Sequence, residues 1–132
     1  MLVLDTHILV WWVNNDKALS KTAARAIRAT RARGDELIVS SISVWEICML
    51  IRKGRMALRM DLDQWLELIA AVEGLRFVPV DNALCRAATA LPGDFHKDPA
   101  DRMIVATARK FAATLATADE KILRYEHVTT LS

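Results

Sequence analysis

The sequence is poor in the residues that build disulfide frameworks and phosphate-binding loops. It contains only two cysteines and four glycines among 132 residues. Cys48 and Cys85 lie in apolar stretches without the CxxC spacing of a redox or zinc motif, so we expect two reduced thiols in the core. The scarcity of glycine and the lack of any GxxxxGK[ST], GxGxxG or GxSxG motif argue against P-loop, dinucleotide-binding and serine-hydrolase sites.

Long hydrophobic runs are also missing. No apolar stretch reaches the roughly 18 to 20 residues of a membrane span. An acid already stands fifth in the opening residues MLVLDTH, which is unlike a signal peptide. We therefore expect a cytoplasmic protein. The three histidines, His7, His96 and His127, are scattered and form no HExxH motif or Cys/His pair, so zinc is not expected.

What is present suits one globular domain spanning residues 1–132. Hydrophobic residues make up 53% of the chain and charged residues 26%, and the formal net charge is +2. This mildly basic balance permits nucleic-acid binding without requiring it. Short apolar runs predict strands at residues 2–4, 36–39, 77–80 and 114–116. Helical stretches are predicted at residues 20–33, 42–53, 62–72, 82–91 and 99–111, and the only long loop at 92–97. The alternation predicts an α/β fold with a mainly parallel central sheet.

Two acids follow predicted strands directly. Asp5 ends the run LVLD, and Asp119 follows TLATA. Ligands of open α/β sheets bind at the carboxyl ends of the strands, which is where these side chains would stand. Each acid alone also fits the N-cap of a following helix, where its carboxylate accepts a hydrogen bond from a backbone N–H.

Glu46 is the only charged residue between Ile38 and Ile51. Burying a carboxylate without a partner costs several kcal/mol or forces it to bind a proton, so a function is indicated. The alternative is a capping box, in which Glu46 would accept a hydrogen bond from the backbone N–H of Ser43.

A third acidic position lies in the segment HKDPADRM, where Asp98 and Asp101 are three residues apart. They fit an N-cap and the third residue of a helix, respectively. Four acids gathered at one sheet edge would nevertheless repel one another, and an ionised cluster needs a cation. Mg²⁺ or Mn²⁺ is expected, because all candidate ligands are hard carboxylate oxygens.

The motifs MLVLDTHILVWW, SSISVWEI, HKDPADRMIVATA and LATADEKI, in this order and spacing, resemble PIN-domain proteins of the VapC toxin group. The resemblance covers almost the whole chain. It implies a three-layer α/β/α fold, endoribonuclease activity on RNA, a homodimer, and neutralisation by a cognate antitoxin in a hetero-oligomeric complex.

Carried over residue by residue, the acidic quartet of that group falls on Asp5, Glu46, Asp101 and Asp119. Asp5 and Asp101 are expected to bind the metal directly. Glu46 and Asp119 are expected to complete the shell through water, or to position and deprotonate the attacking water. Asp98 remains an alternative to Asp101 as the direct ligand.

Thr6 and Thr117 stand beside the acids and are expected to orient ligands or water, while Arg102, next to Asp101, is a candidate RNA contact. A second basic face is formed at helical spacing by Lys21, Arg25 and Arg28, for which simple solvation is the alternative. The tryptophans occupy apolar helical stretches, and core packing is expected for them. These are Trp11, Trp12, Trp45 and Trp65; base stacking, and an interface for Trp11 or Trp12, are the alternatives.

Three other functions fit parts of the pattern. A PIN-domain nuclease could process RNA without being a toxin, or the same fold could be a catalytically silent protein-binding module. An aspartyl-phosphate enzyme would place its nucleophile at Asp5, but such enzymes usually carry a second Asp two residues on, where this chain has His7.

Overall fold

Five parallel strands form the central sheet of the computed structural model, which describes residues 1–132. The order across the sheet is β3-β2-β1-β4-β5. The strands are β1 (Leu2–Leu4), β2 (Leu37–Ser40), β3 (Leu75–Val78), β4 (Thr114–Ala116) and β5 (Thr130–Leu131). The expectation of a mainly parallel sheet is therefore confirmed.

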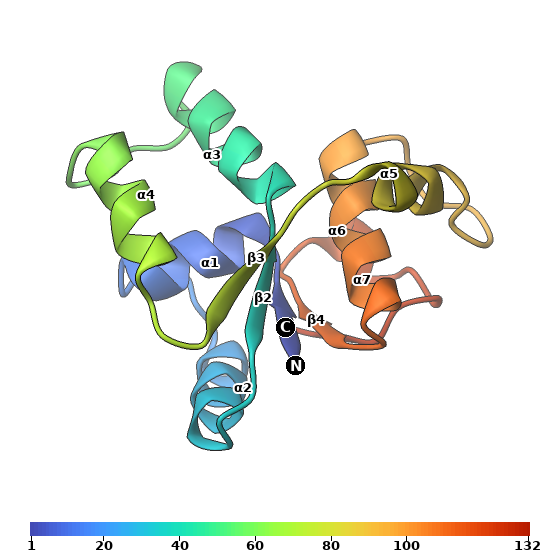
Figure 1. Ribbon diagram of the computed structural model, residues 1–132, viewed down its shortest axis with the longest axis horizontal. Coiled ribbons are helices and arrows are strands. Elements are labelled where there is room, and N and C mark those ends of the chain that lie inside the picture. The colour runs from blue at the N-terminus through green and yellow to red at the C-terminus, as the bar shows by residue number, and fades with distance from the viewer.

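Helices cover both faces of this sheet and give the three-layer α/β/α arrangement expected (Figure 1). In Figure 1, α1, α2 and α4 lie on one side, α5, α6 and α7 lie on the other, and α3 follows the upper end of β2. The helices are α1 (Thr6–Val13), α2 (Lys21–Ala32), α3 (Ile42–Arg52), α4 (Leu62–Ala70), α5 (Asn82–Thr89), α6 (Pro99–Lys110) and α7 (Glu120–Leu123). None of them combines the length and the apolar character needed to cross a membrane.

Strands β1 and β2 are almost wholly apolar because both of their faces are buried, whereas β3 carries the exposed Arg76. Val3 and Ile38 point into one core cluster with residues of α5 and α6, while Leu2 and Leu37 point into the other, with residues of α1 to α4. The alternation follows the period of two along a strand. The outcome is two apolar layers with the sheet between them.

The chain reverses its direction of travel across the sheet at β1. It passes from β1 to β2 and β3 on one side and to β4 and β5 on the other. Such a switch point leaves a crevice outside the carboxyl ends of the two central strands. Here those strands are β1 and β4, and the N–H of Asp5 donates to the carbonyl of Ala116 across 3.0 Å at this end.

Three features of the secondary structure differ from the sequence-based expectation. Strand β3 lies two residues earlier than the predicted 77–80, and it ends before Pro79, which has no N–H for a sheet hydrogen bond. Helix α1 was expected only as an apolar helical stretch after Asp5, without bounds. Residues 53–61 form a second long connection, so the loop at 92–97 is not the only one.

The expected burial of some cysteine and tryptophan side chains was wrong. Cys85 is exposed and Cys48 only half-buried, although both are free thiols as expected. Trp65 is fully buried, and its indole N–H donates to the Asn14 side chain across 3.0 Å. Trp45, in contrast, is 58% exposed, because it lies on the face of α3 that turns away from the core.

Candidate active site

All five acids singled out from the sequence line one open pocket of about 400 Å³ at the switch point. They come from the beginnings of α1, α6 and α7 and from the second turn of α3. The pocket is lined by Asp5, His7, Trp11, Glu46, Asp98, Asp101, Ala118 and Asp119. Helices far apart in the sequence therefore bring five carboxylates together in one pocket.

Asp5 is the most buried of these acids, with only 7% of its surface exposed. It caps α1, and its Oδ1 accepts a hydrogen bond from the Thr6 N–H across 2.8 Å. Its Oδ2 accepts one from the Thr117 hydroxyl across 2.6 Å. Burial raises the pKa of Asp5, while the bonds from Thr117 and Thr6 act against this rise. Both threonines thus hold the carboxylate in a fixed orientation.

Asp98 and Asp119 are also N-caps. Oδ1 of Asp98 accepts from the N–H of Asp101 across 3.1 Å, and Oδ1 of Asp119 accepts from the N–H of Lys121 across 2.8 Å. The cap interpretation is therefore correct for these residues, but it does not compete with a functional one. In each case the cap occupies one oxygen, and the carboxylate still lines the pocket.

The capping-box interpretation of Glu46 is wrong. Helix α3 begins at Ile42 after Ser41, so Glu46 lies beyond the first turn. The Ser43 hydroxyl is hydrogen-bonded to the Thr6 hydroxyl instead, at 2.8 Å, which joins α3 to α1. Burial raises the pKa of Glu46; the Thr6 hydroxyl lowers it, and the charges of Asp5 and Asp98 raise it further. Glu46 consequently faces the other acids and not its own backbone.

The pKa of Asp101 is shifted strongly. Burial, followed by the charge of Asp98 and then those of the other pocket acids, raises its pKa from 3.8 to about 8. Its Oδ2 lies 3.0 Å from Nε2 of His96, while Nδ1 of that ring faces the N–H of Asp98 at 3.4 Å. A carboxyl group with this pKa is largely protonated at neutral pH unless a cation offsets its charge.

Asp98 and Asp101 both enter the pocket, so the direct ligand from the DPADR segment stays a prediction. The two differ in burial, since Asp98 is exposed and Asp101 is partly buried. Asp101 therefore has fewer competing water contacts and a more constrained side chain. This difference is the physical reason to keep Asp101 as the preferred ligand.

The Arg102 guanidinium, expected to contact RNA, is instead bonded to backbone carbonyls of its own domain. Its Nε donates to the carbonyl of Ala88 across 2.9 Å, and its Nη1 donates to those of Phe95 and His96 across 2.9 and 3.2 Å. These bonds tie the loop before α6 to the end of α5. The prediction that Arg102 contacts RNA finds no support in this arrangement.

The sequence did not place two residues, His7 and Trp11, in the acidic pocket. They stand four residues apart on α1, and their ring centroids are 5.7 Å apart. Spacing by four places two side chains on one helix face, so the signal was present once α1 was recognised as a helix. Trp11 is half-buried at the edge of the pocket instead of lying within the core.

The donor set fits a hard divalent cation. Asp5, Glu46 and Asp101 have raised pKa values, and in each case repulsion from another acid of the pocket contributes to the rise. Carboxylate oxygens are the ligands that hard divalent cations prefer. In this conformation no three His, Cys, Asp or Glu side chains stand close enough together to hold an ion. Binding one would therefore require the more exposed carboxylates to rotate toward Asp5.

Comparison with known proteins agrees with this architecture. The PIN domain family model matches residues 2–128. Ribonuclease VapC22 of Mycobacterium tuberculosis is 35% identical over 126 residues, which cover 96% of this chain and 92% of that protein.

Solved structures show the same fold at low sequence identity. VapBC2 from Rickettsia felis, bound to a promoter DNA fragment, matches with a TM-score of 0.69 at 18% identity, covering 98% of this chain and 96% of that one. FitAcB from Neisseria gonorrhoeae matches with a TM-score of 0.70 at 16% identity, covering 100% and 97%. A toxin–antitoxin complex from Klebsiella pneumoniae matches with a TM-score of 0.68 at 16% identity, covering 100% and 97%. The family model, the ribonuclease relative and the fold agree, and the chain belongs to the PIN-domain family, in its VapC group.

Proposed function

We propose that this protein is a metal-dependent endoribonuclease that acts as the toxin of a toxin–antitoxin pair. The observation that carries the proposal is the set of five carboxylates in one pocket, at the switch point of a PIN-domain fold. The 35% identity to a VapC ribonuclease over nearly the whole chain supports RNA as the substrate.

Asp5 and Asp101 would hold Mg²⁺ or Mn²⁺, with Glu46 and Asp119 completing the shell through water and Asp98 as the alternative to Asp101. A bound divalent ion would lower the pKa of a water molecule and offset negative charge on the phosphate of the RNA. Among the chain's own groups, Thr117 and Thr6 orient the Asp5 carboxylate. Glu46, with its raised pKa, is suited to accept a proton from the attacking water.

The same comparisons support an antitoxin as a partner. Similar folds from Rickettsia felis and Klebsiella pneumoniae were solved as a VapBC2 assembly on promoter DNA and as a toxin–antitoxin complex. We propose that this chain likewise pairs with a cognate antitoxin protein and works as a homodimer within a larger hetero-oligomer.

The nuclease is tested with purified protein and a labelled single-stranded RNA. We expect cutting with Mg²⁺ or Mn²⁺, none in excess chelator, and a loss of at least about a hundredfold for Asp5→Asn, because the charge lost from the pocket is one that the metal needs. Circular dichroism and the melting temperature show whether the variant still folds. Cutting that persists in chelator would rule out the metal-dependent mechanism.

The toxin role needs a separate test in cells. Expression of the wild type should arrest bacterial growth, and Asp5→Asn should not. Co-expression of the protein encoded beside the gene should relieve the arrest. A wild type that cuts RNA in vitro but leaves growth unchanged would point instead to an RNA-processing nuclease.

A further inference from the structure

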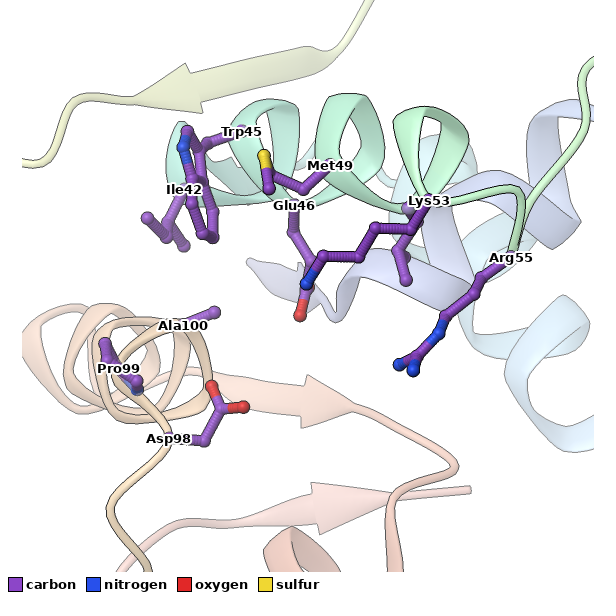
Figure 2. Close-up of a pocket in the computed structure, with 10 residues that line it drawn as sticks. Ile42, Trp45, Glu46, Met49, Lys53, Arg55, Asp98, Pro99 and Ala100 are labelled. Carbon is purple, nitrogen blue, oxygen red and sulfur yellow. The ribbon is translucent and has the colours of Figure 1, made fainter.

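A second pocket, of about 470 Å³, opens between α3 and the first turn of α6 (Figure 2). It shares Glu46 and Asp98 with the acidic pocket, so the two hollows adjoin. Its remaining lining is different in character. It combines apolar side chains with two cations: Ile42, Trp45, Met49, Leu50, Lys53, Arg55, Pro99 and Ala100.

Trp45 stands at one end of this pocket with 58% of its surface exposed, more than any other large hydrophobic residue of the chain. No aromatic ring and no cation stacks on it. More than half of the Trp45 surface is therefore open to solvent. Planar indoles with a free face are the side chains on which unpaired nucleobases stack in single-stranded RNA recognition.

Lys53 and Arg55 stand at the other end, at the close of α3 and just beyond it. Figure 2 shows both side chains extending into the space between α3 and α6, toward the side on which Glu46 and Asp98 lie. Both are exposed, and neither forms a salt bridge or a side-chain hydrogen bond. Two unpaired cations thus border a pocket whose other charges are negative.

The positions of Lys53 and Arg55 matter because the acidic pocket by itself repels an RNA strand. A phosphodiester that approaches five carboxylates is repelled by them, and binding requires positive charge on the path of the strand. The basic face of α2 does not supply it, because Figure 1 shows α2 at the opposite end of the sheet from α3. Lys53 and Arg55 are the cations that line the hollow adjoining the acids.

We propose that the pocket between α3 and α6 is a nucleotide-binding subsite for single-stranded RNA, in which Trp45 stacks on the base next to the cleaved bond. Lys53 and Arg55 contact the backbone phosphates of the same strand. The proposal rests on the proposed ribonuclease function and adds to it a site for the neighbouring nucleotide. A flat apolar platform combined with unpaired cations favours RNA over an apolar protein segment as the occupant.

The role of Trp45 is tested by measuring RNA binding in a variant that cannot cut RNA. In an Asp5→Asn background with Mg²⁺, fluorescence anisotropy measures the affinity for a fluorescein-labelled single-stranded RNA 12-mer of mixed sequence. Trp45→Ala should weaken binding roughly 5- to 100-fold, the usual loss for one stacked base, and Trp45→Phe should restore most of the affinity. In the active protein, Trp45→Ala should raise KM more than it lowers kcat, because stacking serves binding.

The role of Lys53 and Arg55 is tested by measuring how RNA affinity depends on salt concentration. Lys53→Ala/Arg55→Ala should reduce the slope of log affinity against log salt by about 1.4, because each phosphate that a cation neutralises on a single strand adds about 0.7 to this slope. Arg25→Ala/Arg28→Ala on α2 removes the same charge at a distance and should leave the slope unchanged. An equal change in both double variants would overturn the assignment of the phosphate contacts.

The outcomes separate this subsite from the function on which it rests. A wild type that neither binds nor cuts RNA refutes the proposed function. A wild type that cuts RNA while Trp45→Ala binds and cuts equally well refutes the subsite alone. If Trp45→Ala changes the molar mass in light scattering and leaves RNA affinity intact, the face is a contact between copies of the chain, and the subsite is again refuted.

Discussion

The Thr117 hydroxyl donates a hydrogen bond to Oδ2 of Asp5 across 2.6 Å, joining the carboxyl ends of the two central strands. The same hydroxyl oxygen accepts the N–H of Asp119 across 3.0 Å. One side chain therefore orients the most buried acid of the pocket and the loop that carries another. Because Thr117 is itself fully buried, neither bond is exposed to competition from solvent.

Replacing Thr117 with Val should damage both stability and activity. The change leaves the buried Asp5 carboxylate with one donor fewer and the N–H of Asp119 without its acceptor, at a cost of about 1–3 kcal/mol. It should also raise the pKa of Asp5, since the lost bond favours the charged form. Urea unfolding measures the stability and kcat/KM measures the activity.

Thr117→Ser is the matched control, because it keeps the hydroxyl and removes one methyl group. We expect it to retain most of the activity. A Val variant as active and as stable as the wild type would show that the hydrogen bond to Asp5 is not needed.

The metal-free protein should become less stable as the pH rises from 3.8 to about 8, between the ordinary and the raised pKa of Asp101. The folded state holds the pKa of Asp101 near 8 against 3.8 normally, and those of Asp5 and Glu46 are raised as well. Between these values the folded state binds more protons than the unfolded state, so the free energy of unfolding falls with increasing pH. Urea midpoints measured in chelator at pH 5.5 and 8.5 should therefore be higher at pH 5.5.

Adding Mg²⁺ or Mn²⁺ should reduce this difference between the two pH values. A cation must displace the protons that the cluster binds, so its stabilisation should be larger at pH 8.5 than at pH 5.5. An equal shift of the midpoint at both pH values would contradict the assignment of the metal to this cluster.

Much of the fold was predictable because it depends on short-range patterns. Continuous apolar runs indicated strands buried on both faces, and Asp98 before Pro99 marked the start of α6 at its observed residue. Helix α1 was harder to predict, because the run from Ile8 to Val13 is apolar without a polar face. Its helical conformation follows from the cap at Asp5 and from packing against α3 and the sheet.

The acids of the pocket were predictable for a similar reason. Parallel strands bring their carboxyl ends together, and Glu46 stood out as the only charge in an apolar run. The partner of Asp101 was not predictable. The 3.0 Å approach of His96 depends on how the loop before α6 folds back, which no local spacing encodes. The exposure of Trp45 likewise depends on which face of α3 packs against the neighbouring helices.

Asp101→Asn should make the metal-free protein more stable at pH 8.5 while it abolishes activity. The amide removes a charge that burial and four neighbouring acids disfavour, and it keeps the shape of the side chain. The pH dependence of the urea midpoint should flatten accordingly. Glu67→Gln, on the exposed side of α4, removes one negative charge away from the pocket and should leave the midpoint nearly unchanged. A loss of stability at pH 8.5 in Asp101→Asn would refute the repulsion argument.

Arg102→Lys should loosen the loop that precedes α6. The arginine donates to three carbonyls at once, and the single ammonium group of lysine cannot reproduce this planar set of donors. Because the loop carries His96 and leads into Asp98, we expect faster proteolysis within residues 92–98 and a lower kcat, with a stability loss of about 1–3 kcal/mol. Limited proteolysis followed by mass spectrometry locates the cleavage.

The salt dependence of RNA affinity then distinguishes the two roles considered for Arg102. Lysine keeps the positive charge, so the comparison also needs Arg102→Met, which removes it. If the arginine holds the loop, both variants expose it to protease, and the salt slope is the same as in the wild type. If it contacts a phosphate, the slope falls by about 0.7 in Arg102→Met alone. With the guanidinium bonded to carbonyls of Ala88, Phe95 and His96, we expect the first result.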